Sequence, residues 1–236
     1  MRVGILETGA PPRDLQPRFG RYATMFKSLL SEGRYDWRVY DVRAGELPAR
    51  AEDCAAYIVT GSAAGAYDLD PWIVRTQEFL QDAKGRAALV GVCFGHQLMA
   101  QAFGGRVIKS PKGWGIGMHH YQVFDRRPWM DEASVIASPA SHQDQVVDAP
   151  PNTTVLAGCD FTPMGMLAYD DQPAISIQLH PEFEPTFAVA LIEARRESRF
   201  GDDQATKAVE SLSGRDDRLR LGRWIEAFLE RHDGAP

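Results

Sequence analysis

The 236-residue sequence lacks several features that would assign a protein to a broad functional class. It has no apolar run of about 18 residues, so we expect no membrane-spanning helix and no membrane partner. It has neither the Gly-x4-Gly-Lys-Ser/Thr pattern of a phosphate loop nor the Gly-x-Gly-x-x-Gly pattern of a dinucleotide site, so we expect no nucleotide cofactor. The net charge of −6 argues against nucleic-acid binding.

Cysteine and histidine are also scarce, with three and six residues respectively. Cys54, Cys93 and Cys159 make an odd number without Cys-x-x-Cys spacing, which favours free thiols in a reducing cytoplasm. His119 and His120 are adjacent on an expected strand, where neighbouring side chains point to opposite faces, and no third ligand has zinc spacing. We therefore expect no metal and no other cofactor. The chain begins directly with a strand pattern and shows no signal peptide, which also favours a cytoplasmic protein.

The most informative stretch surrounds Cys93. An apolar run from Ala87 to Val92 predicts a buried strand, and a helix-like segment follows from His96 to Phe103. A glycine lies two residues away on each side of the cysteine, where the backbone must reverse sharply and a side chain would clash. This is the pattern of a nucleophile elbow, with sulfur in place of a serine hydroxyl. The free N–H groups of the helix favour a thiolate and place the Phe94 N–H where an oxyanion would form.

A base for this thiol occurs far downstream. His180-Pro181-Glu182 follows a strand-like run from Ile175 to Leu179. Because parallel strands in an open α/β fold place their sites at one edge of the sheet, a histidine after this strand can reach the cysteine after another. The carboxylate of Glu182 can accept a hydrogen bond from the second ring nitrogen of His180 and fix its tautomer. The two segments together predict a Cys-His-Glu triad.

Strand-like and helix-like segments alternate through the first hundred residues and predict right-handed β-α-β units around a parallel sheet. The expected strands are Val3–Leu6, Trp37–Tyr40, Ala55–Val59 and Ala87–Val92, and helices are expected over Phe19–Leu30 and from Pro71 onward. After Arg106 the expected strands become short and are separated by turns, which suggests antiparallel additions at one edge of the sheet. These later strands are 106–109, 118–124, 134–137, 154–157, 166–169 and 175–179.

The last fifty residues contain two helix-like segments. Amphipathic patterns predict helices over Phe187–Phe200 and Asp216–His232, whereas the polar segment Gly201–Gly214 receives no assignment. Arg195, Arg196 and Arg199 fall on the first of these helices, followed by acidic residues. We expect them to form a solvated basic face.

On these motifs the chain resembles the class I, triad-type glutamine amidotransferases. Gly91–Gln97 resembles their nucleophile motif, His180-Pro181-Glu182 resembles their His-x-Glu pair, and Thr60-Gly61-Ser62 lies where the family has a glycine-rich oxyanion turn. The resemblance covers roughly residues 1–185 and is closest to the stand-alone GMP-synthase-like and γ-glutamyl peptidase-like branch. It implies a flavodoxin-like, doubly wound α/β fold with a mostly parallel sheet, a nucleophile elbow and added antiparallel strands. We expect a single domain over residues 1–236, with C-terminal helices from about residue 186.

The resemblance also implies roles for individual residues. Cys93 would attack the carbonyl of a γ-glutamyl amide and form a thioester, with His180 and Glu182 completing the triad. N–H groups of Phe94 and of the Gly61–Ser62 turn would form the oxyanion hole. Ser62 replaces the second glycine of the family pattern, so either residue of this turn could be the donor.

Substrate contacts are implied for Gln97, Ser141 and His142, although a solvated glutamine and a loop-stabilising histidine stay open as alternatives. The expected activity is hydrolysis of a small γ-glutamyl compound. Ammonia could leave and pass to a separately encoded synthetase subunit, or an amine or peptide could leave, as in a γ-glutamyl peptidase. A third possibility is a non-catalytic regulatory subunit with the same fold.

Overall fold

A nine-stranded sheet forms the centre of the computed structural model, which describes residues 1–31 and 33–233. Its strand order is β2-β1-β3-β4-β11-β10-β9-β6-β7. The first five of these strands run parallel to one another. Their bounds are Asp36–Asp41 for β2, Arg2–Glu7 for β1, Ala56–Val59 for β3, Ala88–Val92 for β4 and Ala174–Ile177 for β11. With β11 as the fifth parallel strand, this order is that of the flavodoxin-like, doubly wound fold, which confirms the predicted fold class.

The remaining four strands extend the sheet in antiparallel fashion, as the short strands after Arg106 predicted. They are Met166–Tyr169 for β10, Thr153–Gly158 for β9, Gly115–Val123 for β6 and Val135–His142 for β7. A separate two-stranded sheet pairs β5, Arg106–Lys109, with β8, Asp144–Asp148. The sequence pattern did not indicate β8, because this half-buried strand follows β7 after a single intervening residue.

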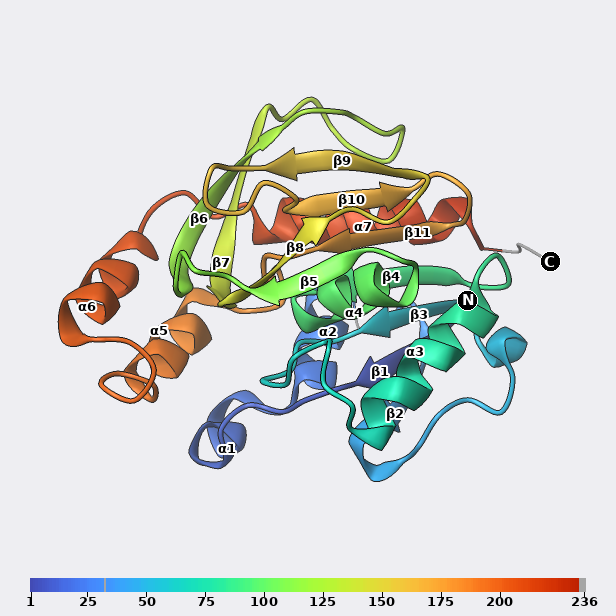
Figure 1. The fold of residues 1–236 in the computed structure, drawn as a ribbon, viewed down its shortest axis with the longest axis horizontal. Helices are drawn as coiled ribbons and strands as arrows, with labels where there is room; N and C mark the ends of the chain where they lie inside the picture. Colours follow the sequence, from blue (N-terminus) through green and yellow to red (C-terminus); the bar gives the residue numbers. More distant parts are fainter. Residues whose placement is uncertain (32, 234–236) are drawn as a thin grey trace.

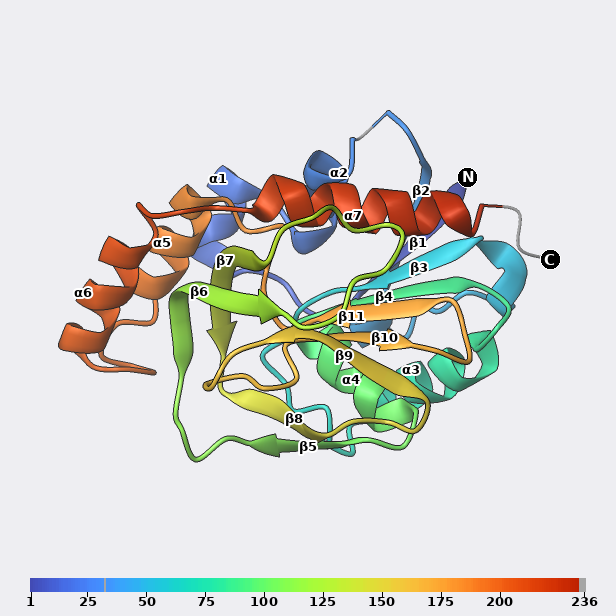
Figure 2. The same ribbon diagram turned by 90° about the horizontal axis from the view of Figure 1, so that it is seen from above.

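Helices cover both faces of the parallel part of the sheet (Figures 1 and 2). Helices α2, Tyr22–Leu29, and α7, Arg218–Arg231, pack on one face, where Phe26 and Trp224 join the apolar side chains of β1, β3 and β4. Helices α3, Pro71–Ala83, and α4, Phe94–Ala102, pack on the other face, where Leu80 and Leu98 join Tyr57 and Leu89. The strands of this part are therefore buried on both sides, as parallel strands usually are.

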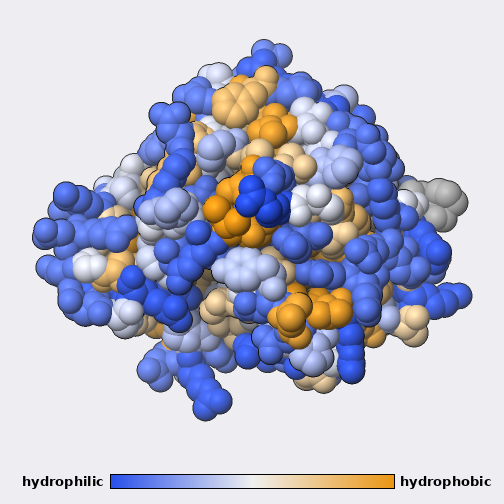
Figure 3. Space-filling view, viewed as in Figure 1, coloured by the Kyte–Doolittle hydropathy of each residue, from blue (hydrophilic) through white to orange (hydrophobic). Residues whose placement is uncertain are grey.

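Helices α5, Pro185–Glu193, and α6, Asp202–Ser211, lie beyond the ends of β6 and β7, at the left of Figure 1. The predicted helix over Phe187–Phe200 is wrong in its second half, because α5 ends at Glu193 and Glu197 adopts a left-handed φ of 61°. The unassigned segment Gly201–Gly214 contains α6. The surface of this view is mostly hydrophilic, with small apolar patches between polar side chains (Figure 3).

The first predicted helix, Phe19–Leu30, starts later than expected, and a short helix precedes it. Helix α1 covers Gln16–Phe19 and ends at Gly20, whose φ of 75° lies in the left-handed region, and α2 starts at Tyr22. Glycine adopts this conformation at little cost, so it breaks a pattern whose apolar spacing is continuous.

Among the described residues, no helix has both the length and the apolar character needed to cross a bilayer.

Candidate active site

Cys93 lies at the sharp turn between β4 and α4. Its φ of 54° and ψ of −104° fall outside the usual regions for a residue with a side chain, which matches the strained elbow predicted from the sequence. A Cβ atom on Gly91 would lie 2.6 Å from the Gly95 carbonyl oxygen, and one on Gly95 would lie 2.2 Å from the Val59 carbonyl oxygen. Both glycines are therefore required by close backbone approach, one within the elbow and one against β3.

His180 follows β11 and reaches the same edge of the sheet. Its Nδ1 lies 2.7 Å from Oε1 of Glu182, and both side chains are buried. Since the carboxylate accepts, Nδ1–H donates, which leaves Nε2 available for the cysteine. The ring also stacks on Phe183, with centroids 3.8 Å apart and planes 7° from parallel. These contacts fix the orientation of the imidazole.

Charge rather than burial decides the protonation of His180. Burial alone would lower its pKa, but the negative charges of Cys93 and Glu182 and hydrogen bonds with both raise the pKa to about 10. The charged form of the ring therefore predominates near neutral pH, and a negative charge on Cys93 would stabilise it.

The Thr60-Gly61-Ser62 turn lies directly beside these two side chains. A Cβ atom on Gly61 would lie 3.0 Å from Cε1 of His180 and 3.9 Å from Cβ of Cys93. Thr8 stabilises the turn, because its hydroxyl donates to the carbonyl oxygens of Thr60 at 2.8 Å and of Gly61 at 3.1 Å. Thr8 was not identified from the sequence, since a lone threonine after a strand carries no recognisable signal.

The backbone of Phe94 and the turn are tied together. The Gly95 N–H donates to the Thr60 carbonyl oxygen at 3.1 Å, which links the start of α4 to the end of β3. Across residues 1–31 and 33–233, the N–H groups of Phe94, Gly61 and Ser62 have no hydrogen-bond acceptor. The Phe94 ring is buried and lies 5.7 Å from that of Trp72. Phe94 can therefore offer the site only its backbone.

A pocket of about 390 Å³ opens over Cys93 and His180. Five further predicted site residues line it, namely Gly61, Ser62, Ser141, His142 and, from the first turn of α4, Gln97. Gln97 is not solvated: its Nε2 donates to the Asp144 carbonyl oxygen at 2.7 Å and to Oε1 of Gln178 at 3.0 Å. The buried His142 donates Nδ1–H to the same carbonyl at 3.2 Å. Both side chains thus support the turn between β7 and β8.

The two ends of the pocket differ in charge. One end contains Asp68 and Asp144 together with Lys109, and the Asp144 carboxylate hydrogen-bonds the Tyr67 hydroxyl. The other end contains Tyr22, Arg195 and Arg199. The prediction that Arg195 belongs to a solvated face is wrong, because Arg195 is partly buried in the turn after α5 and donates to the Ser141 hydroxyl at 2.9 Å. The helix pattern misled that prediction, since α5 ends before this residue.

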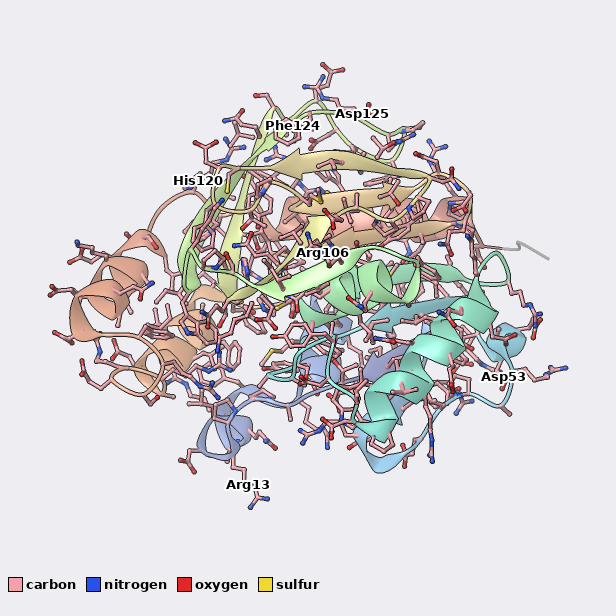
Figure 4. All side chains as sticks on the ribbon, in the orientation of Figure 1. Arg13, Asp53, Arg106, His120, Phe124 and Asp125 are labelled. Carbon is pink, nitrogen blue, oxygen red and sulfur yellow. The ribbon has the colours of Figure 1, made fainter. Side chains whose placement is uncertain are left out.

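Buried histidine side chains elsewhere show no metal-site geometry. His119 packs against the rings of His142 and Phe161, whereas its neighbour His120, labelled in Figure 4, is exposed. Over the described part of the chain, no group of three or more His, Cys, Asp or Glu side chains has the arrangement of a metal centre.

Comparisons with known proteins agree with this geometry. Residues 33–194 match the family model described as glutamine amidotransferase class-I. A glutamine amidotransferase-like protein of Schizosaccharomyces pombe is 29% identical over 96% of this chain and 98% of its own. Gamma-glutamyl peptidase 2 of Arabidopsis thaliana is 24% identical over 97% of this chain and 96% of its own.

Two further comparisons concern part of the chain and the fold. One subunit of the glutamine-hydrolysing GMP synthase of Methanopyrus kandleri is 29% identical over 47% of this chain and 60% of its own. The crystal structure of a glutamine amidotransferase from Thermotoga maritima superposes with a TM-score of 0.78 at 18% identity, covering 99% of this chain and 98% of that one.

Proposed function

Since the chain belongs to the class I glutamine amidotransferase family, we propose that it is a cysteine-dependent amidohydrolase that cleaves γ-glutamyl amide bonds. The observation that carries this proposal is the juxtaposition of Cys93, on a strained elbow, with a buried His180 that Glu182 orients at 2.7 Å. A protein that only kept the fold would have no need to maintain a strained cysteine and a charged, buried histidine at one point.

The first half of the reaction forms a thioester. The Cys93 thiolate attacks the γ-carbonyl carbon, and the negative charge that develops on the carbonyl oxygen is held by N–H groups of Phe94 and the Gly61–Ser62 turn. The carbon–nitrogen bond then breaks as His180 transfers its Nε2 proton to the departing nitrogen. Ammonia or an amine leaves, and the glutamyl group remains on sulfur.

The second half restores the enzyme. The neutral His180 takes a proton from water, whose oxygen attacks the thioester carbon. The carbon–sulfur bond breaks, glutamate is released, and the thiolate and imidazolium pair forms again. Glu182 accepts the Nδ1–H bond throughout and stabilises the positive charge on the ring.

The ends of the pocket fit the head group of such a substrate. The end with Asp68 and Asp144 offers carboxylates to an α-ammonium group, and Gln97 and His142 hold the adjoining turn in position. Two leaving groups are compatible with this arrangement. In the first, ammonia would pass to a separate synthetase, as the similarity to one subunit of a GMP synthase suggests. In the second, an amino acid or peptide would leave, as the similarity to a gamma-glutamyl peptidase suggests.

The three free cysteines favour a cytoplasmic enzyme.

Incubation of the purified protein with glutamine and with γ-glutamyl peptides, followed by measurement of released glutamate, tests the proposal. The wild-type protein is expected to release glutamate, Cys93→Ala to release none, and Cys159→Ala to match the wild type, because Cys159 lies outside the pocket. Release that persists in Cys93→Ala would refute the proposed nucleophile.

A further inference from the structure

The positive charge of Arg195 lies in the wall of the pocket without a carboxylate partner among the described residues. Within the described residues, no carboxylate forms an ion pair with this guanidinium, and its one hydrogen-bond partner is the neutral hydroxyl of Ser141. Burial lowers the pKa of Arg195 from its ordinary value and the charge of Arg199 adds to this effect, whereas Tyr22 and Cys93 act in the opposite direction without reversing it. A partly desolvated cation with unused donors is costly unless an anion pairs with it.

The neighbouring Arg196, in contrast, does form ion pairs with carboxylates. Arg196 hydrogen-bonds both oxygens of Glu193 at 2.7 Å and also pairs with Asp202. Arg195 points the other way, into the pocket that contains Cys93. Its unpaired charge is therefore a property of the pocket wall rather than of a crowded basic surface.

Ring contacts through Phe183 and Tyr22 link the surroundings of Arg195 to those of His180. His180, which donates the proton to the leaving nitrogen, stacks on Phe183, and Phe183 in turn stacks on Tyr22 with ring centroids 5.7 Å apart. Tyr22 lies within electrostatic range of both Arg195 and Cys93. The end that offers carboxylates to the α-ammonium group involves Asp144 and Tyr67 instead.

We propose that Arg195 binds a carboxylate of the leaving group, so that the preferred substrate is a γ-glutamyl amino acid or peptide rather than glutamine. This inference rests on the proposed amidohydrolase function. The planar guanidinium matches a carboxylate through two parallel hydrogen bonds, and Ser141 holds one of its nitrogen atoms in place. Glutamine releases ammonia, which has no carboxylate, and would leave Arg195 unpaired.

Two dipeptide analogues test this directly. γ-Glutamylalanine and γ-glutamylalaninamide have leaving groups of nearly equal size, but only the first carries a carboxylate. Because a hydrogen bond to a charged group is strong, we expect the wild-type protein to prefer the first by about 10- to 100-fold in kcat/KM. Arg195→Gln is expected to abolish this preference and Arg195→Lys to restore part of it. Arg196→Gln, the matched control, is expected to leave the preference unchanged.

The outcomes separate the inference from the proposed function. Equal kcat/KM for the two analogues with the wild-type protein would overturn the role of Arg195 and leave the amidohydrolase intact. A preference that survives in Arg195→Gln would do the same. If neither analogue is cleaved, calorimetry can measure the binding of γ-glutamylalanine to the Cys93→Ala protein. Binding that becomes weaker when Arg195→Gln is added supports the role of Arg195 even though the protein is not a hydrolase. Absence of binding overturns both the role of Arg195 and the proposed function.

Discussion

The pocket has two walls, which hold their functional groups in different ways. The first wall comes from the ends of β3 and β4 and from the segment after β11, and it presents Gly61, Cys93 and His180. Here backbone shape does most of the positioning. Gly91 and Gly95 allow contacts that no other residue could fit, and Cys93 is held in a left-handed conformation.

The second wall comes from the end of β7 and the turn after α5, and it presents Ser141 and Arg195. A single hydrogen bond of 2.9 Å joins these two side chains, so side chains rather than backbone shape present the polar groups of this wall. The difference suggests that the first wall carries out bond cleavage, while the second selects what is cleaved.

The largest effects should follow from changes to the first wall. Cys93→Ala and His180→Ala remove the nucleophile and the proton carrier, and we expect each to lower kcat by about 10⁴-fold or more. Glu182→Gln should cause a smaller loss, because this carboxylate only orients and stabilises the histidine. Steady-state kinetics with γ-glutamylalanine measure all three. An effect of Glu182→Gln as large as that of His180→Ala, in a folded protein, would contradict this division of roles.

Gly61→Ala tests the close approach itself. The new Cβ atom would lie 3.0 Å from Cε1 of His180, so the ring must move by a few tenths of an ångström from its position beside Cys93. Because small displacements of reacting groups are costly, we expect a loss of about 10²-fold in kcat/KM with the thermal midpoint little changed. Ser62→Ala is the matched control, since it keeps the backbone N–H and adds no atoms. Similar losses in both variants would mean that side-chain contacts, not space beside His180, matter at this turn.

Two buried histidines, one on each wall, should titrate in opposite directions. The charges of Cys93 and Glu182 raise the pKa of His180 to about 10, whereas burial lowers that of His142 to about 3. NMR titration of the ring protons measures both values. Cys93→Ala should lower the pKa of His180 by at least about one unit, because a negative partner is lost, and should leave His142 unchanged. An unchanged pKa of His180 in this variant would show that no thiolate lies beside it.

A smaller effect concerns stability in acid. Burial lowers the pKa of His96 to about 3, below the ordinary value near 6.5 of an unfolded chain. Between these two pKa values only the unfolded state takes up this proton. The contribution of His96 to the free energy of unfolding is therefore fully present above about pH 6.5 and decreases as the pH falls. The loss from this one group is about 1.4 kcal/mol per pH unit.

Urea unfolding of His96→Gln between pH 7 and pH 5 measures this contribution. The pH dependence should be shallower than that of the wild-type protein by about one proton. His120→Gln, in which an exposed histidine is replaced, serves as the control and should retain the slope of the wild type. Equal slopes in all three proteins would contradict a neutral, buried His96.

Much of the fold could be predicted because parallel strands and helix faces leave strong periodic patterns. The strands ending at Val59 and Val92 are apolar throughout, and the glycines around Cys93 mark the turn that follows. The region after Glu184 was harder, because α5 ends without a glycine or proline. The residue that reverses the chain is Glu197, an unusual choice for a left-handed conformation, and no local rule identifies it.

The candidate site shows the same division. The residues of the first wall were found from the sequence, because strained turns demand particular residue types. Arg195 was missed, since its place in the pocket wall depends on a turn and not on its neighbours in the chain. Thr8 was missed for a similar reason: it follows β1, 52 residues before Thr60 in the sequence, and its hydroxyl donates to the Thr60 carbonyl oxygen. Contacts of this kind exist only once the chain is folded.

The most direct test of the account is detection of the γ-glutamyl thioester on Cys93. The protein is mixed with γ-glutamylalanine, quenched in acid during turnover, digested and examined by mass spectrometry. We expect one glutamyl group on the peptide containing Cys93, greater accumulation in a variant with slowed hydrolysis such as Glu182→Gln, and none in Cys93→Ala. A glutamyl group on another residue, or full turnover by Cys93→Ala, would contradict the assignment of the first wall to bond cleavage.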